Sequence, residues 1–309
     1  MPSIRNATDA AERAVGSPNL TLVLIEVAGA PDTRACLDNL LTYDLPILAV
    51  LRSEPQWLAD YPQVRFEVLA LPVPLRRKRG VELAESEFVA LVEDTGRLGA
   101  KLLQGIEQAF GDPACAAASG PVALEASLEP RYQALACTEY GRYQVEAVLG
   151  AGVRAAQSAQ RLPGNLLVYR QSALRPLLAR HPEGLIEGLV NAELLAAGSH
   201  LVISPELGVR YAGRDRHGAR LKTRFQHGRI YGGGLAACMG LGGRFVHACK
   251  CLLLPLVLSA RSLGHMSRNP AITRGASVAL WILGFELCWS LGEFWGCLFG
   301  KPSDLEAWR

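Results

Sequence analysis

The chain has 309 residues, of which 50% are hydrophobic and 20% are charged. It can therefore build a sizeable core, which excludes wholesale disorder. The formal net charge of +3 is too small to indicate nucleic acid, and we expect no nucleic-acid partner. The eight cysteines contain no Cys-x-x-Cys pair and no His/Cys spacing typical of zinc, which favours a reduced, cytoplasmic setting. Residues 1–18 lack a long apolar core, so we expect a flexible N-terminus and no signal peptide.

Short apolar runs alternate with helical patterns from residue 19 to about residue 236. The run 20–27 is rich in β-branched residues and ends in Ala-Gly-Ala-Pro, which predicts a strand and a turn. Further strands are predicted at 46–51, 64–71, 88–92 and 114–119, and helices at 32–43, 81–86 and 98–110. This alternation predicts an α/β domain with a single, mainly parallel sheet flanked by helices.

Ligands of such sheets bind beyond the carboxyl ends of the strands, which directs attention to the segments after Val27, Leu51 and Val92. Glu93 and Asp94 follow a buried run there, and carboxylate oxygens suit Mg²⁺ or Mn²⁺ bridging a nucleotide diphosphate. The alternative is an ordinary turn, with Asp94 or Thr95 capping the helix predicted from residue 98.

Three other segments could contribute to a site. The basic run 76–79 could contact phosphates, although a charge run is commonly a solvated face. The segment 163–170 predicts a tight turn that leads into a strand ending in arginine. Glu187 begins an amphipathic helical stretch, where a surface position is the alternative.

The last 70 residues contain two long apolar segments, 245–260 and 276–300, joined by a basic linker over 261–274. A transmembrane hairpin, an interfacial pair lying on the bilayer and buried helices of a soluble oligomer are the three alternatives. A hairpin would export the arginines of the linker against the positive-inside rule, and Glu286 and Glu293 interrupt the second segment. Interfacial or re-entrant attachment is therefore the preferred interpretation. The predicted domain boundaries are 1–18, 19–236 and 237–309.

Several motifs in order resemble the family 2 glycosyltransferases of the GT-A fold. They are LTLVLIEVAGA, RRKRGVELAESEFVALVEDTG, SGPVALEASLEPRYQALACTEYGRY, LPGNLLVYRQSAL and GLIEGLVNAELLAAGSHLVISPELGVRY. The segment Cys137-Thr-Glu-Tyr-Gly-Arg142 is similar to a "CEYGR" segment of bacterial members with apolar C-terminal helices. The resemblance implies a GT-A-like fold and inverting transfer of a sugar from a nucleotide-sugar donor.

The resemblance also implies roles for individual residues. Glu93 and Asp94 would lie on the donor loop, with Asp94 at the divalent metal, Mn²⁺ or Mg²⁺. Nucleotide-sugar contacts would come from Arg79 and from Glu26, which ends the first strand where the family commonly has a proline. Glu187 would be the catalytic base. The acceptor-side loop would contain Gly164 and Asn165.

The acceptor implied is a lipid-linked or cell-envelope glycan at the cytoplasmic face of the membrane, with a homo-oligomer or glycan-assembly proteins as further partners. The chain departs from the family pattern at Thr95, where an acid or histidine commonly binds metal. It also departs after the second strand, which reads Leu51-Arg-Ser53 in place of aspartates, and at Tyr211, where a histidine is common. These departures leave a second hypothesis, a catalytically degenerate scaffold or regulator of the same fold.

Overall fold

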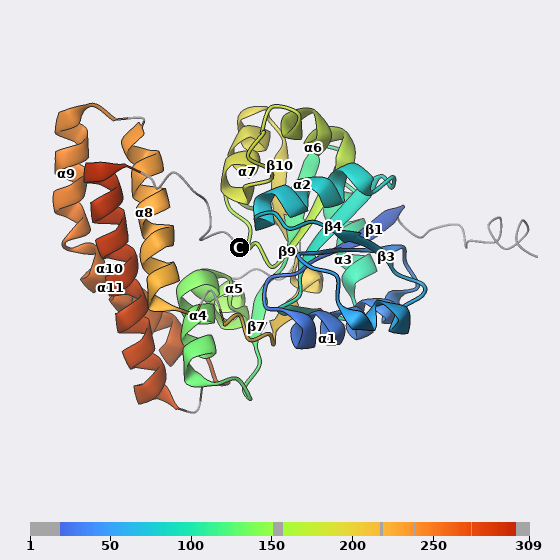
Figure 1. Cartoon of the computed structure of the whole chain (residues 1–309), viewed down its shortest axis with the longest axis horizontal. Coiled ribbons are helices and arrows are strands. Elements are labelled where there is room, and N and C mark those ends of the chain that lie inside the picture. Colours follow the sequence, from blue (N-terminus) through green and yellow to red (C-terminus); the bar gives the residue numbers. More distant parts are fainter. Residues whose placement is uncertain (1–18, 151–156, 217–218, 238, 273, 301–309) are drawn as a thin grey trace, which may run out of the picture.

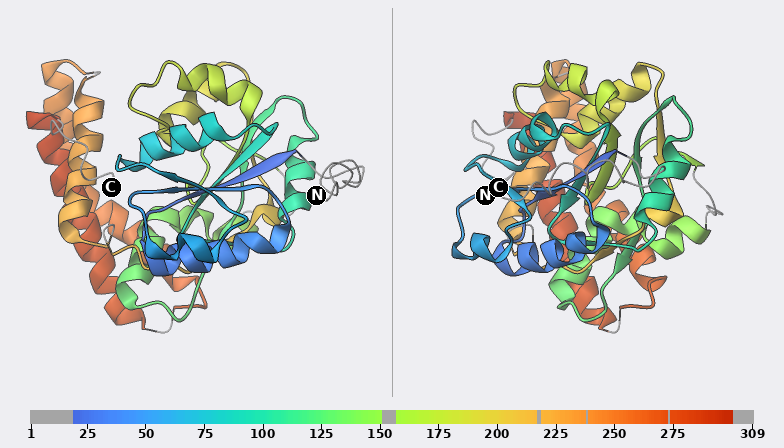
Figure 2. Two further views of the ribbon diagram at one scale, coloured as in Figure 1. Left: turned by 45° about the vertical axis from the view of Figure 1, so that its right-hand side comes forward. Right: turned by 90° about the vertical axis from the view of Figure 1, so that its right-hand side faces the viewer.

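The computed structural model describes residues 19–150, 157–216, 219–237, 239–272 and 274–300. Figure 1 shows an α/β domain with a bundle of long helices along one side, and the two views of Figure 2 show the same arrangement. The predicted flexible N-terminus, 1–18, lies outside the described residues.

The central sheet has eight strands in the order β3-β2-β1-β4-β9-β6-β10-β8. Strands β3, β2, β1 and β4 run parallel, and β9 runs antiparallel between β4 and β6. A mostly parallel sheet was expected and is confirmed. The strand bounds are β1 Leu20–Ile25, β2 Ile47–Leu51, β3 Arg65–Val68, β4 Phe88–Glu93, β6 Cys115–Ser119, β8 Gln157–Ser158, β9 Leu166–Arg170 and β10 His200–Ile203.

A second, three-stranded sheet corrects the expectation of a single sheet. It consists of β5 (Gly96–Leu98), β11 (Val209–Tyr211) and β7 (Val122–Leu124) in that order. Helix α3 therefore spans only Leu102–Phe110, not 98–110 as predicted. Residues 96–98 are extended because they pair with β11, more than a hundred residues further along, and such a partner leaves no local signal.

Helices cover both faces of the central sheet, because successive side chains of each buried strand point to opposite faces. Leu22 of β1 packs with Leu37 and Ile106 on the face covered by α1 (Ala30–Leu40) and α3. Val23, the next residue, packs with Val81 on the other face. That face carries α2 (Val73–Leu83), α6 (Gln171–Leu178) and α7 (Glu187–Ala196).

The helical bundle is joined to the domain through a shared apolar core. Val278 and Phe285 of α11 pack with Tyr132 and Leu135 of α4. The predicted apolar segment 245–260 is broken, because α9 and α10 are bent by 51°. The bounds are α4 Pro130–Tyr140, α5 Val145–Gly150, α8 Leu221–Ala237, α9 Leu241–Cys251, α10 Leu254–Ser267 and α11 Gly275–Phe299, with 3₁₀ turns at Leu41–Tyr43, Gln56–Asp60, Gly141–Tyr143 and Pro205–Leu207.

Within the described residues, α11 is long and apolar enough to cross a membrane, and α9 with α10 would meet the same test as one bent span. Both glutamates of α11 face the bundle interior. Glu286 accepts a hydrogen bond from Ser262 at 2.6 Å, and Glu293 lies 2.9 Å from His247. The outer face of α11 is therefore apolar despite these two acids.

Glycines let α8 and α11 pack backbone to backbone in parallel. A β-carbon at Gly228 or Gly232 of α8 would fall on a carbonyl oxygen of α11, at Trp289 or Glu293. On α11, Gly292 and Gly296 are restricted in the same way by carbonyl oxygens of α8. Both helices thus carry the Gly-x-x-x-Gly spacing that brings helices into close contact.

Replacing Gly292 by alanine is expected to destabilise the bundle by about 1–3 kcal/mol, because the added methyl group has no room unless α8 moves. Gly284→Ala is the matched control, since its β-carbon would meet only the Leu221 side chain at 3.4 Å. Thermal unfolding in detergent compares the two. Equal unfolding temperatures for the two variants would contradict the tight contact at Gly292.

Candidate active site

The sheet brings the predicted acidic residues to one edge. Ile25, which ends β1, lies opposite Glu93 of β4, and the amide of Glu93 donates to the carbonyl of Asn165 at 3.1 Å. Glu26 follows β1 directly, and its carboxylate accepts a hydrogen bond from the Arg52 amide at 2.7 Å. Glu26, Glu93 and Asn165 thus come from three segments that end or begin at the same edge.

An array of three charges stands at this edge. The Arg77 guanidinium binds Glu93 at 2.6 Å and Glu187 at 2.5 Å, through different nitrogens. Arg77 is only 4% exposed, whereas the Glu187 side chain is 30% exposed. The Tyr140 hydroxyl donates to the second oxygen of Glu93 at 3.2 Å. One buried arginine therefore links the predicted donor loop to the predicted base.

Burial decides the protonation of Glu93. It raises the pKa of Glu93 to about 7, with Arg77 lowering it and Glu187 raising it. Burial also raises the pKa of the Tyr140 hydroxyl well above its usual value, and the charge of Glu93 adds to that rise. Glu93 thus changes charge near neutral pH, while Tyr140 remains a hydrogen-bond donor.

Asp94 holds the loop between β1 and α1. Its carboxylate accepts hydrogen bonds from the amides of Val27, Ala28 and Gly29 at 2.9–3.2 Å and from the Thr33 hydroxyl at 2.9 Å. The alternative of a cap on the helix predicted from residue 98 is wrong, because the carboxylate lies at the start of α1 instead. The role of Asp94 as a metal ligand stays a prediction.

Thr95 is covered by the segment that follows β11 (Val209–Tyr211). Its carbonyl oxygen accepts hydrogen bonds from the amides of Ala212 and Gly213, at 2.9 and 3.0 Å. A β-carbon at Gly213 would clash with Thr95, which is 1% exposed. The position at which the sequence resemblance implies a metal-binding acid or histidine is therefore buried.

The two predicted acceptor-side residues lie against the charge array. A β-carbon at Gly164 would stand 3.0 Å from a carboxylate oxygen of Glu187. Asn165 is fully buried, and neither its amide nitrogen nor its amide oxygen has a hydrogen-bond partner among the described residues. A buried amide of this kind is a candidate contact for a polar ligand.

The basic run 76–79 belongs to a helix of the α/β domain. It lies inside α2, not before a helix over 81–86 as predicted. Arg79 pairs with Glu67 of β3 at 2.8 Å, and its contact with the nucleotide stays a prediction. The residue at the carboxylates is Arg77, and the signal for it was the helical spacing of Val73, Gly80 and Val81, which places Arg77 on the buried face.

The Cys137–Arg142 segment forms the junction between this edge and the helical bundle. Tyr140 contacts Glu93, and the neighbouring Glu139 binds Arg224 of α8 at 2.6 Å. A β-carbon at Gly141 would clash with His265 of α10. The three consecutive residues Glu139, Tyr140 and Gly141 therefore contact α8, the charge array and α10, respectively.

No family model matches the chain, and neither does any curated protein sequence. Among solved structures, the chain is similar to the mannosyltransferase PcManGT from Pyrobaculum calidifontis in complex with GDP-mannose and Mn²⁺. The identity is 16%, the TM-score is 0.54, and the match covers 91% of this chain and 88% of that one. GalNAc-T7 with UDP, GalNAc and Mn²⁺ matches at 11% identity and a TM-score of 0.44, over 64% of this chain and 44% of that one. The first match establishes a GT-A-like fold.

Proposed function

We propose that this chain is an inverting glycosyltransferase related to family 2. It would move a sugar from a nucleotide-sugar donor to a lipid-linked or cell-envelope glycan acceptor. The observation that carries the proposal is the Glu93–Arg77–Glu187 array at the carboxyl edge of a GT-A-like sheet. PcManGT, solved with GDP-mannose and Mn²⁺ on a similar fold, supports the donor class.

The array suggests how the donor prepares the base. Without a donor, the Glu187 carboxylate is occupied by its ion pair with Arg77 at 2.5 Å. The diphosphate of a donor competes for the guanidinium, which binds phosphate through two nitrogens. Glu187, once released, accepts the proton of the acceptor hydroxyl while that oxygen bonds to the anomeric carbon and the bond to the diphosphate breaks. Attack from the face opposite the leaving group inverts the configuration.

In this structure the carboxylates of Glu93 and Asp94 do not form a divalent-cation site. The oxygens of Asp94 accept donors of the β1–α1 loop, and those of Glu93 accept Arg77 and Tyr140. The proposed transfer therefore uses only the side chains of this chain and the diphosphate. Mn²⁺ or Mg²⁺ stays in the proposal as the counter-ion of the diphosphate, supported by the Mn²⁺ of PcManGT, and Asp94 as its predicted ligand would first have to exchange a hydrogen bond.

One observation favours the second candidate, a scaffold or regulator of glycan assembly that has lost catalysis. Thr95 replaces the expected metal-binding side chain and is covered by the segment at Gly213. Turnover decides between the two candidates. Full-length protein in detergent, given nucleotide sugars and a polyprenyl-linked glycan or glycolipid acceptor, should release nucleoside diphosphate only when acceptor is present. If no donor gives acceptor-dependent release of nucleoside diphosphate, the second candidate, a scaffold or regulator, is favoured.

We further propose that the bundle attaches the protein to the cytoplasmic face of a membrane. Of the 20 large hydrophobic residues that are exposed among the described residues, 15 lie on or between α9, α10 and α11. Leu241, Leu256 and Leu280 are each more than 70% exposed. An apolar surface of this extent is typical of membrane or protein contact, and Trp281 and Trp295 suit the interface.

Replacing Leu256 and Leu280 together by glutamate is expected to reduce co-flotation with liposomes at least tenfold, because two charges would enter the apolar layer. Leu189→Glu is the matched control, since Leu189 is 49% exposed but belongs to α7 of the α/β domain. A double variant that floats like the wild type would contradict attachment through this face. Truncation of the bundle is a poor test, since removal of α11 would expose Tyr132 and Leu135.

A further inference from the structure

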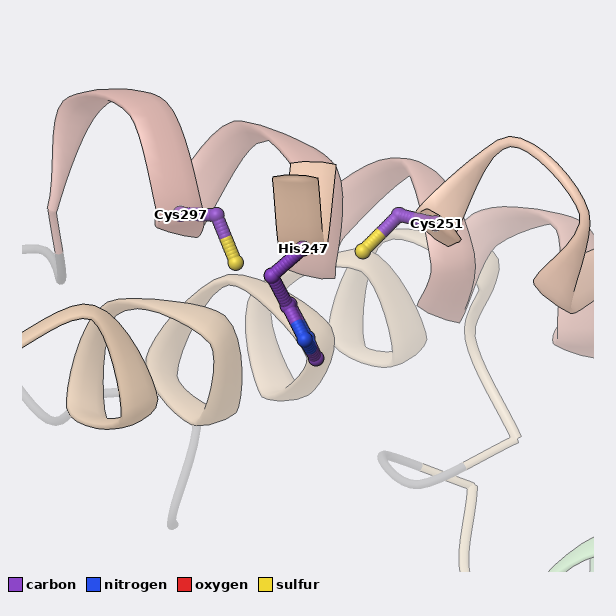
Figure 3. Close-up of side chains that lie close together, drawn as sticks. All are labelled: His247, Cys251 and Cys297. Atoms are coloured by element: carbon purple, nitrogen blue, oxygen red, sulfur yellow. The ribbon is translucent and has the colours of Figure 1, made fainter. Parts of the chain in front are cut away.

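Three potential metal ligands meet where α9 crosses α11. His247 and Cys251 are one helical turn apart on α9, and Cys297 lies opposite them on α11. One ligand atom from each residue lies within 4.8 Å of the other two. Figure 3 shows the two sulfur atoms on either side of the His247 side chain, whose imidazole extends away from the line that joins them.

The cysteines are buried and the histidine has a fixed partner. Cys251 is 2% exposed and Cys297 is 1% exposed. The imidazole Nε2 of His247 lies 2.9 Å from one carboxylate oxygen of Glu293, whose other oxygen accepts the Trp289 indole N–H at 3.0 Å. A carboxylate that is itself held in place and fixes a histidine is the usual neighbour of a metal-bound imidazole.

Packing alone gives little reason for α9 to stay in place. Only Ala248 and Cys251 of its eleven residues are buried. The apolar cluster around them contains just one further buried residue, Cys297, with Leu254 and Phe294 at its edge. The two small side chains of α9 bury much less apolar area than the leucine or phenylalanine side chains that commonly hold a helix.

We propose that His247, Cys251 and Cys297 bind a zinc ion that fastens α9 to α11. Two thiolates and an imidazole form a ligand set that zinc prefers, and a fourth position completes the tetrahedron. Binding would release the two thiol protons, since thiolates are the ligands. Glu293 orients His247 rather than binding the metal. This site lies in the bundle, apart from the charge array, and it does not depend on the proposed transfer reaction.

The test uses the full-length protein in detergent, purified with reductant and titrated with Zn²⁺ and, separately, Co²⁺. The wild type should retain one zinc ion per chain and give the thiolate-to-cobalt charge-transfer band of a tetrahedral site. Its unfolding temperature should rise with zinc and fall when a chelator removes the metal. Cys251→Ser and Cys297→Ser should each lower zinc affinity at least a hundredfold.

Two matched variants keep the result interpretable. Cys249→Ser should bind zinc like the wild type, because Cys249 is exposed and lies outside the cluster. His247→Gln removes the nitrogen ligand while keeping both thiols, so it should bind cobalt with a weaker and altered band. A wild type without the cobalt band, or a Cys249→Ser variant as defective as Cys251→Ser, would overturn the proposal. So would a Cys251–Cys297 disulfide in protein alkylated at cell lysis.

Discussion

Replacing Arg77 by methionine is expected to lower the free energy of unfolding by about 3–5 kcal/mol. The guanidinium is 4% exposed and binds both Glu93 and Glu187, so its removal leaves two carboxylates facing each other without a cation. Methionine keeps much of the volume, which separates the charge effect from a cavity. Denaturant unfolding of the full-length protein in detergent measures the difference. The free energy of unfolding of Arg77→Lys should lie between those of the wild type and Arg77→Met, because one ammonium cannot bind both carboxylates in the same way.

Arg79→Met is the matched control on the same helix. Its ion pair with Glu67 is 41% exposed on the arginine side, so we expect a loss of about 0–1 kcal/mol. Equal losses for the two variants would contradict the buried array.

The loss at Arg77 should also depend on pH. The folded-state pKa of Glu93 is raised to about 7 from its usual 4.5, so ionising Glu93 in the folded protein opposes stability as the pH rises through this window. Below about pH 5 Glu93 is protonated and needs no cation. The difference between wild type and Arg77→Met should therefore widen from pH 5 to pH 8.

Replacing Glu187 by glutamine should lower the transfer rate by about 10²–10⁴-fold, because the amide cannot accept the proton of the acceptor hydroxyl. Nucleotide binding should be kept or become tighter, because the diphosphate no longer competes with the Glu187 carboxylate for Arg77, while the ion pair between Arg77 and Glu93 remains. Steady-state turnover and nucleotide titration of the same preparation separate the two effects.

Glu193→Gln is the control on the same helix, where the carboxylate pairs with Arg180 and His181 at the surface. It should keep wild-type turnover. A Glu187→Gln variant with a wild-type rate would show that Glu187 is not the catalytic base. Another group would then have to accept the proton of the acceptor hydroxyl.

Much of the fold follows from the sequence because its strands are strongly patterned. The apolar runs at 20–27 and 88–92 became β1 and β4, and their carboxyl ends placed Glu26, Glu93 and Asp94 at one edge as the sheet rule predicts. The strand β5 is an exception. Residues 96–98 are extended only because β11 pairs with them, and that partner is invisible to a local pattern.

The sequence predicts where the site lies in the sheet, but it does not predict which side chains pair with each other there. Glu93 and Glu187 are 94 residues apart, and no spacing shows that one arginine would join them. Arg77 stood in a run of four basic residues, where charge suggested a solvated face and concealed the helical periodicity. The sequence also contains no sign of the cluster of His247, Cys251 and Cys297. These residues form no sequence motif, because they come together only where α9 packs against α11.

Calorimetric titration of the full-length protein with UDP, GDP and dTDP, each with and without Mn²⁺, tests whether the charge array belongs to a donor site. We expect one nucleotide to bind, and we expect Mn²⁺ to tighten its binding as the counter-ion of the diphosphate. Asp94→Asn should weaken nucleotide binding, because it disturbs the hydrogen bonds that hold the β1–α1 loop. Failure of all three nucleotides to bind, with or without Mn²⁺, would contradict a donor site at the Glu93–Arg77–Glu187 array.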